Sequence, residues 1–276
     1  MNFRTDLAVE AAVTQKITPG DVTQHQQNIG AVTRSTIRIL TEQGASALGK
    51  PRGKYVTVSL PRLTDHEGEI ATAGTVVGQA LQEMLPPEGT VLVVGLGNRT
   101  VTPDALGPTV ADGVLATRHI GGEFARSAGL TDLRPVAVIA PGVLGQTGAE
   151  SSELVRGICR EIHPAAVIVV DALAAATPER LGCTVQVCDT GIHPGSGVGN
   201  NRRPLNRQVL GVPVIGIGVP TVVDAALTPD APPMMVTPRE IDLVIARAAR
   251  LVTTAIHTAL QPAYAPADLM EVALGM

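Results

Sequence analysis

The chain has 276 residues, which is the length of one large domain or two small ones. Hydrophobic residues make up 45% of it, with no Trp, two Tyr and two Phe, so the core must be built from aliphatic side chains. The net charge of −4 and the scarcity of aromatic rings argue against direct nucleic-acid binding. Because there is no secretory signal, no long uncharged apolar stretch and only three cysteines, we expect a cytoplasmic protein without a membrane span.

The first third of the chain predicts a polar arm followed by paired strands. Residues 1–30 are mostly polar and are interpreted as a loosely packed N-terminal arm. Residues 34–40 and 54–60 alternate polar and apolar side chains, which predicts two half-exposed strands that pair as a β-hairpin-like segment. Residues 68–85 have helical character and stop at two consecutive prolines.

From residue 91 onward, strand and helix patterns alternate. Continuous apolar runs predict strands buried on both faces of a parallel sheet, and they lie at 91–94, 136–140, 167–170, 184–188 and 212–217. Two helices are expected to begin at capping boxes, Thr147 with Glu150 and Thr237 with Glu240. We therefore predict a single α/β domain over residues 1–276. It would be a three-layer α/β/α, phosphorylase/hydrolase-like fold around a mostly parallel central sheet.

Two aspartates follow apolar runs, at positions where α/β proteins concentrate function. Asp171 ends one run and Asp104 lies shortly after another. A carboxylate buried there costs free energy unless it is paired or used. Two neighbouring carboxylates share a proton, so one can act as a general base toward water while the other donates to the peptide group. The alternative is that each aspartate caps a helix, and their spacing does not separate the two interpretations.

The turn that follows the apolar run at 91–94 is a candidate for supporting the site. Gly95, Gly97 and Asn98 follow a strand, but the third glycine of a dinucleotide-binding loop is missing. We interpret the three residues as a tight turn that needs a positive φ, and we expect no cofactor.

Two further polar residues are candidates for the site. His193 opens a glycine-rich loop at 193–200, whose backbone can approach a ligand closely. With Asp104 and Asp171 it would form an alternative site for a divalent transition metal; otherwise it is a hydrogen-bonded histidine in a structural loop. Asp224 follows another apolar run, where it would either orient the aspartate pair or cap the next segment.

Motifs over nearly the whole chain resemble those of the germination protease (spore endopeptidase) family. They lie at residues 4–10, 95–108, 141–148, 171–175, 191–200 and 218–224. The resemblance implies a homotetrameric endopeptidase that degrades small acid-soluble spore proteins in the spore core at germination. It places the family's proposed catalytic aspartates on Asp104 and Asp171. It also implies a fold similar to that of the hydrogenase-maturation proteases, relatives that bind metal at positions similar to Asp104, Asp171 and His193.

The chain departs from the family pattern in two places. Members are usually made as zymogens whose N-terminal extension is removed by self-cleavage, whereas three residues precede the motif at residue 4 here. Members also usually carry a long insertion after the motif at 218–224, where about ten residues are present here. We expect activity to be retained and substrate docking or regulation to differ. A nonenzymatic small-ligand binding module, using the loops at 95–98 and 193–200, stays open as an alternative.

Overall fold

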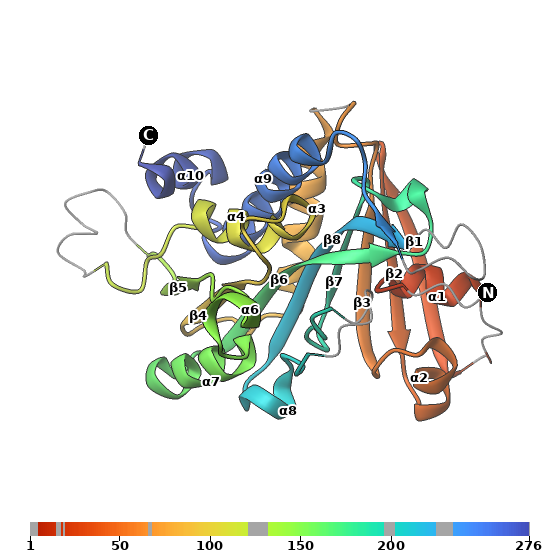
Figure 1. Ribbon diagram of the computed structural model, residues 1–276, viewed down its shortest axis with the longest axis horizontal. Coiled ribbons are helices and arrows are strands. Elements are labelled where there is room, and N and C mark those ends of the chain that lie inside the picture. The colour runs from red at the N-terminus through yellow and green to blue at the C-terminus, as the bar shows by residue number, and fades with distance from the viewer. Residues whose placement is uncertain are drawn as a thin grey trace.

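The computed structural model describes residues 5–14, 18, 20–65, 68–120, 132–195, 202–224 and 234–275. Within these residues, a nine-stranded sheet runs through the middle of the molecule and helices cover both of its faces (Figure 1). The strand order is β1-β2-β3-β7-β8-β6-β4-β5, and β9 pairs with β8 outside this path. The predicted α/β class with three layers is confirmed.

One half of the sheet is parallel. It contains β4 (Val91–Gly95), β5 (Val136–Ile139), β6 (Ala166–Ala175) and β8 (Val214–Asp224). Helices lie on both sides of these strands, which is why their sequences are continuous apolar runs rather than alternating ones. The prediction of buried strands is confirmed for β4, β6 and β8, whereas β5 lies at the end of the strand order and only its Val136 is buried.

The other half of the sheet is antiparallel. It contains β1 (Val22–Ile29), β2 (Val32–Ile39), β3 (Gly53–Ser59), β7 (Thr184–Cys188) and the short β9 (Met235–Val236). The predicted pairing of the two half-exposed strands is confirmed by β2 and β3. The sheet is therefore mixed rather than mostly parallel. Only residues 176–183 connect β6 to β7, which is too short for the helical crossover that a parallel β7 would need.

Helices pack on both faces of the sheet. One face carries α3 (Glu69–Gln82), α4 (Leu106–Gly113), α9 (Ile241–Leu260) and α10 (Pro266–Leu274). The other carries α1 (Ala8–Thr14), α2 (Glu42–Leu48), α7 (Ser151–Ile162) with the short α6 (Leu144–Thr147) before it, and α8 (Arg207–Leu210). Among the described helices, α9 is long and apolar enough to cross a membrane, but 67% of its apolar window is buried in the protein.

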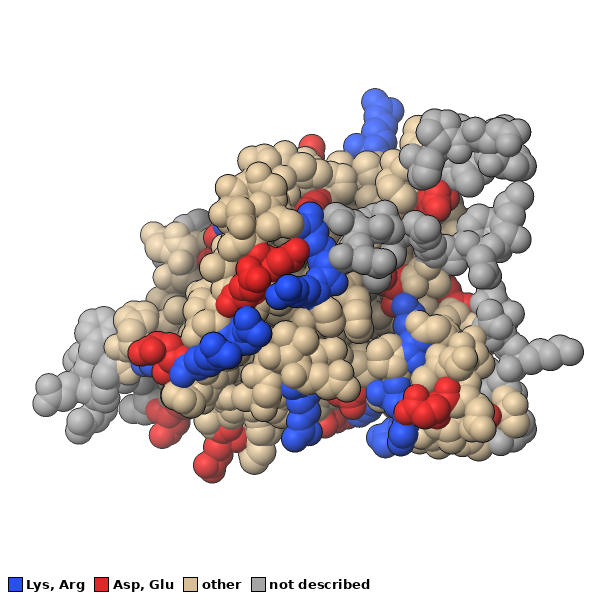
Figure 2. All heavy atoms as spheres, turned by 60° about the horizontal axis from the view of Figure 1, so that its bottom comes forward, with Lys and Arg blue, Asp and Glu red and all other residues tan. Residues whose placement is uncertain are grey.

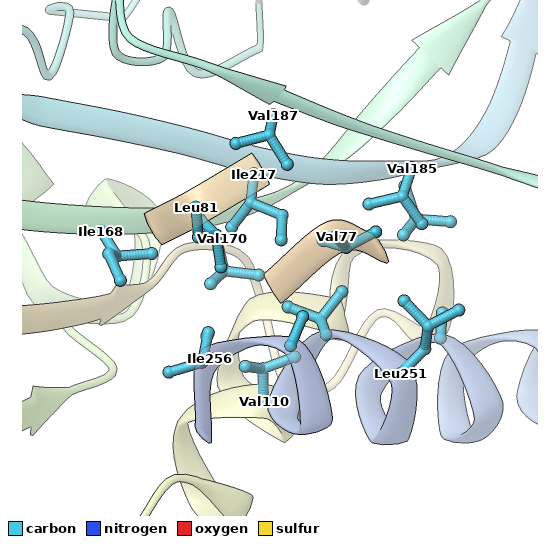
Figure 3. Close-up of a cluster of buried hydrophobic side chains, with 14 of the residues drawn as sticks. Val77, Leu81, Val110, Ile168, Val170, Val185, Val187, Ile217, Leu251 and Ile256 are labelled. Atoms are coloured by element: carbon cyan, nitrogen blue, oxygen red, sulfur yellow. The ribbon is translucent and has the colours of Figure 1, made fainter. Parts of the chain in front are cut away.

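The largest core lies between the sheet and the helices α3, α4 and α9. Its side chains interdigitate from both layers (Figure 3): Val77, Leu81, Val110, Ile168, Val170, Val185, Val187, Ile217, Leu251 and Ile256. Aliphatic side chains alone fill this core, as the composition requires. Along β6, residues alternate between the two faces, so Ile168 and Val170 enter this core while Val167 and Val169 face the layer of α7.

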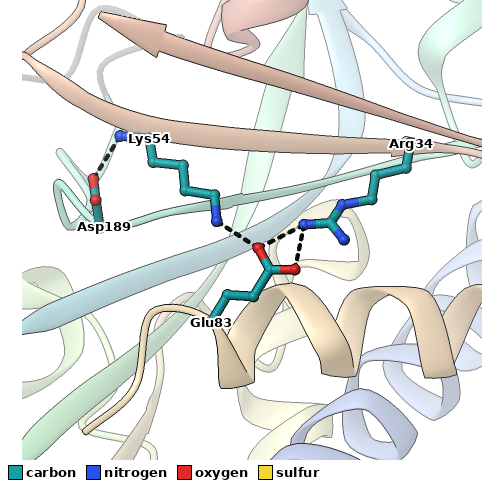
Figure 4. A network of polar contacts seen from close by, with 4 residues as sticks. All are labelled: Arg34, Lys54, Glu83 and Asp189. Atoms are coloured by element: carbon teal, nitrogen blue, oxygen red, sulfur yellow. Dashed lines mark hydrogen bonds and ion pairs between the residues drawn. The ribbon is translucent and has the colours of Figure 1, made fainter. Parts of the chain in front are cut away.

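An ion-pair network ties the end of α3 to the antiparallel half of the sheet (Figure 4). The Glu83 carboxylate accepts hydrogen bonds from Arg34 Nη2 at 2.7 and 2.8 Å and from Lys54 Nζ. Burial would raise the pKa of Glu83, but these hydrogen bonds and charges outweigh it and lower that pKa. The backbone of Lys54 in turn donates to Asp189 Oδ1 at 2.8 Å, which joins β3 to the turn after β7.

The N-terminal residues do not form the predicted loose polar arm. Leu7 and Ala8 are fully buried, and α1 packs with β2 and β3 in a second core. The polar residues that dominate this region belong to β1, an edge strand whose side chains are mostly exposed. A composition averaged over 30 residues therefore hid a short apolar helix.

The predicted helix over 68–85 is confirmed by α3, but both predicted capping boxes are shifted. Helix α7 begins at Ser151 because Glu150 is its N-cap, and the Glu153 side chain accepts a hydrogen bond from the Glu150 amide. Helix α9 likewise begins after Glu240, and Thr237 Oγ1 donates instead to the carbonyl of Thr221 in β8. In both cases the glutamate expected at the third helical position is itself the N-cap.

Candidate active site

A cavity of about 490 Å³ brings the two predicted aspartates together. Its walls come from the loop after β4, from β6, β7 and β8, from the start of α6 and from Asp6 in the segment before α1. Asp104 and Asp171 both line it, as do His193 and Gly97. The two carboxyl groups that were predicted to act as a pair therefore lie in one concave site beyond the end of β4.

Asp104 is held by the turn that follows β4. It ends the single-turn helix η1 (Thr102–Asp104), and its Oδ2 accepts a hydrogen bond from the Asn98 amide at 2.7 Å. Gly97 has φ +119, and a Cβ there would lie 1.9 Å from the carbonyl oxygen of Asp104. A Cβ at Gly95 would likewise lie 2.1 Å from the carbonyl oxygen of Gly107 at the start of α4. The glycines therefore allow the turn to lie directly against Asp104 and α4.

Asp171 lies within β6 and is only 6% exposed. Its Oδ1 accepts a hydrogen bond from the Ala172 amide at 2.9 Å, and β6 continues to Ala175. Neither aspartate caps a helix, because Asp171 lies inside a strand and Asp104 binds the amide of a preceding turn. The helix-capping alternative is wrong for both.

The charge of Asp104 acts on the carboxyl group of Asp171. Burial raises the pKa of Asp171 well above its usual range, and the charge of Asp104 raises it further. Burial also raises the pKa of Asp104, but the Asn98 amide and the charge of Arg202 oppose that increase. Burial and the charge of Asp104 favour the protonated form of Asp171, while the Asn98 amide and Arg202 favour the charged form of Asp104. This division is what a general acid and a general base require.

His193 also lines the cavity, where it interacts with Lys50 and Asp6. Burial and the charge of Lys50 lower its pKa, while the charge of Asp6 opposes them. Among the described residues, no group of three His, Cys, Asp or Glu side chains could hold a metal ion. The alternative triad of His193 with Asp104 and Asp171 is therefore not assembled. Of the predicted loop at 193–200, only residues 193–195 lie within the described part of the chain.

Asp224 ends β8 and is not among the described residues that line the cavity. Its Oδ1 is buried and has no hydrogen-bond partner within the described residues. A role for Asp224 in orienting the pair stays a prediction.

Five charged residues of the cavity were missed by the reasoning from sequence, namely Asp6, Lys50, Glu150, Arg202 and Arg203. Asp6 lies within the motif at residues 4–10, but the prediction of a loose arm over residues 1–30 gave it no role in the site. Lys50 and Arg202 lie in connections without a strand or glycine pattern of their own. Their position follows only from the tertiary structure.

Fold and cavity together define an α/β protein with a paired-carboxylate site at the edge of its parallel strands, an arrangement suited to acid/base hydrolysis. Comparison with known families agrees: the sequence pattern described as germination protease matches residues 5–232. The chain belongs to the germination protease family and is thus a member of a peptidase family.

Curated relatives support this assignment. The germination protease of Clostridium perfringens is 38% identical over 312 aligned positions, which cover 95% of this chain and 96% of that protein. The germination protease of Caldanaerobacter subterraneus subsp. tengcongensis is 37% identical, with 95% of each chain covered. That of Geobacillus sp. is 42% identical and covers 81% of this chain and 64% of that protein.

One solved structure is more distantly similar. It is the [NiFe] hydrogenase maturation protease HycI from Thermococcus kodakarensis KOD1. The TM-score is 0.40 with 20% identity, and the match covers 65% of this chain and 98% of that one. A likeness of this degree supports no argument about the chemistry of the present site.

Proposed function

We propose that this protein is an endopeptidase that degrades small acid-soluble spore proteins during germination, in the cytoplasm of the spore core. The proposal is carried by one observation: Asp104 and Asp171 line the same cavity, and the charge of Asp104 raises the pKa of Asp171. Membership of the germination protease family supports the peptidase class. The substrate comes from what the family resemblance implies.

In the proposed mechanism, the Asp104 carboxylate takes a proton from a water molecule as its oxygen attacks the scissile carbonyl carbon. Asp171 donates its proton to the carbonyl oxygen, which gives a tetrahedral gem-diol. Asp104 then passes its proton to the leaving nitrogen, the C–N bond breaks, and one hydroxyl of the gem-diol returns its proton to Asp171. One water is consumed, and an acid and an amine are formed. No metal ion takes part.

The surroundings of the pair suit an extended peptide. Exposed apolar side chains of Val101, Leu144 and Met235 line the cavity and offer nonpolar surface beside the carboxyl groups. On the face that includes α7 and α8, basic and acidic side chains are interspersed (Figure 2). Such a surface favours a protein partner over a nucleic acid or an anionic membrane. We further propose that the chain acts as a homotetramer, as the family resemblance implies.

The test is cleavage of a purified small acid-soluble spore protein, with and without a strong chelator, read by mass spectrometry. We expect a few defined cuts that persist in chelator. Asp104→Asn and Asp171→Asn should each lower turnover by about 10²–10⁴-fold, the contribution of a positioned acid or base. The control is Asp112→Asn, because Asp112 pairs with Arg99 on the exposed side of α4.

Three outcomes would contradict the proposal. Wild-type rates in both aspartate variants would exclude the pair. Cuts lost in chelator and restored by a transition metal would show metal-dependent chemistry. No cleavage of any small acid-soluble spore protein would exclude the proposed substrate.

A further inference from the structure

Asp6 meets the strand that carries Asp171. The pairing of β4 with β6 ends at Gly95 and Val170, whereas β6 runs on beside β8 to Ala175. Beyond the end of β4, the Asp6 amide donates to the carbonyl of Ala174 at 2.9 Å, and the Ala174 amide donates to Asp6 Oδ2 at 2.9 Å. The backbone and side chain of Asp6 therefore make the two hydrogen bonds with β6 that a neighbouring strand would otherwise make.

The peptide around Asp6 is fixed from three sides. Gln186 of β7 donates to the carbonyl of Asp6 at 2.9 Å and accepts from the Ala8 amide at 2.7 Å. Lys50 donates to the carbonyl of Thr5 at 2.9 Å. Glu10, one turn further on, accepts from the Ala176 amide at 2.8 Å, just past the end of β6. These contacts hold Asp6 in the cavity wall.

From this position, the charge of Asp6 acts on Asp171. The groups that act on Asp171 are Asp104 from η1 and Asp6 from the N-terminal segment, both negative. Asp6 itself faces Lys50, a lysine whose pKa burial lowers, and His193. Asp104 faces Arg202 on its other side. Two carboxylates thus act on the Asp171 carboxyl group, whereas the positive groups Lys50 and Arg202 interact with those two carboxylates.

We propose that Asp6 is a positioning residue for the aspartate pair, which fixes the end of β6 through Ala174 and, by its negative charge, keeps the shared proton on Asp171. This inference rests on the proposed two-aspartate function. It assigns the N-terminal segment a part in catalysis. Asp6 itself does not contact the scissile bond.

The decisive measurement is a carbon-13 NMR titration of protein labelled at the aspartate carboxyl carbons. Asp6→Asn keeps an oxygen for the Ala174 amide and removes only the charge. The Asp171 signal is assigned by its loss in Asp171→Asn. We expect the midpoint of Asp171 to fall by roughly 0.5–1 unit in Asp6→Asn, the effect of one partly screened neighbouring charge. Glu10→Gln is the matched control, because it also neutralises a buried carboxylate of the same segment, and it should leave the midpoint unchanged.

An unchanged Asp171 midpoint in Asp6→Asn would overturn the proposal, and so would an equal decrease in Glu10→Gln. If Asp6→Asn does not fold, as judged by circular dichroism, Asp6→Ser replaces it, because serine is also neutral and can accept a hydrogen bond. The same two outcomes then decide.

Cleavage kinetics provide a second readout. In Asp6→Asn the alkaline limb of the kcat profile should move to lower pH with little change in KM. Asp6→Ala also removes the acceptor for Ala174 and should lower kcat further. A wild-type protein that cleaves nothing would refute the proposed function, while the titration would still test Asp6. Normal cleavage with an unaltered pH profile and an unaltered titration in Asp6→Asn would refute the role of Asp6 alone.

Discussion

His257 makes the stability of the fold depend on pH. It lies in α9, is 2% exposed, and its Nε2 accepts a hydrogen bond from the Leu115 amide at 3.0 Å. Its Nδ1 is buried without a hydrogen bond of good geometry in the described residues. The Pro266 backbone faces the ring and only partly offsets the cost of burial, so the pKa of His257 is lowered from 6.5 to about 4.

The sign and size of the effect follow from linkage. The unfolded chain binds this proton below pH 6.5, whereas the folded chain binds it only near pH 4, so stability is complete above pH 6.5 and is lost as the pH falls toward 4. Between about pH 7.5 and pH 5 the loss is about 2 kcal/mol, and it approaches about 3 kcal/mol below pH 4. Other titrating groups add their own contributions, and a variant is needed to separate them.

That variant is His257→Gln, which keeps an acceptor for the Leu115 amide and cannot be protonated. Urea unfolding of both proteins at about pH 7.5 and pH 5 gives four free energies. We expect the wild type to lose about 2 kcal/mol more than the variant over this range. Equal losses in the two proteins would refute the assignment of a buried, neutral His257.

Two further predictions concern glycines. Gly97→Ala should lower kcat by about 10²-fold, because the added methyl would collide with Asp104 and displace it. Gly145→Ala, in α6 next to the cavity residue Leu144, adds a methyl group that meets open space and should have little effect on the cleavage rate. Gly78→Ala should reduce stability by about 1–2 kcal/mol in urea unfolding, because its Cβ would lie 2.8 Å from a side chain of α9. Gly157→Ala meets open space in α7 and should instead add up to about 1 kcal/mol, and an equal effect of the two variants would contradict the packing argument.

The strands were predictable because burial on both faces produces a continuous apolar run in the sequence. A run such as 167–170 contains only apolar residues, whatever its neighbours are. Burial does not reveal strand direction: β7 is as fully buried as β4 but runs antiparallel to β8. What decides direction is the length of the connection, and residues 176–183 are too few for a crossover between parallel strands.

The aspartates were predictable for a related reason. A carboxylate directly after a buried run, as at Asp171, stands out because burying it is costly. Asp6 gave no comparable signal, because its partner Ala174 lies 168 residues away in the sequence. The contacts that fix the turn before Asp104 are easier to anticipate, because Asn98 is only six residues from it. Local order in the sequence therefore determined which part of the site could be found.

The different roles proposed for the two carboxyl groups follow from where the fold places them. Asp171 lies inside a strand, is almost fully buried, and accepts one amide hydrogen bond from its own neighbour. Asp104 lies at the end of a short helical turn, is half-buried, and has both the Asn98 amide and the charge of Arg202 nearby. A buried, desolvated carboxyl group such as Asp171 favours its neutral form, whereas a partly solvated one that accepts a hydrogen bond and faces a positive charge, such as Asp104, favours its charged form. In the proposed mechanism, the fold therefore determines which aspartate is the acid and which is the base before substrate binds.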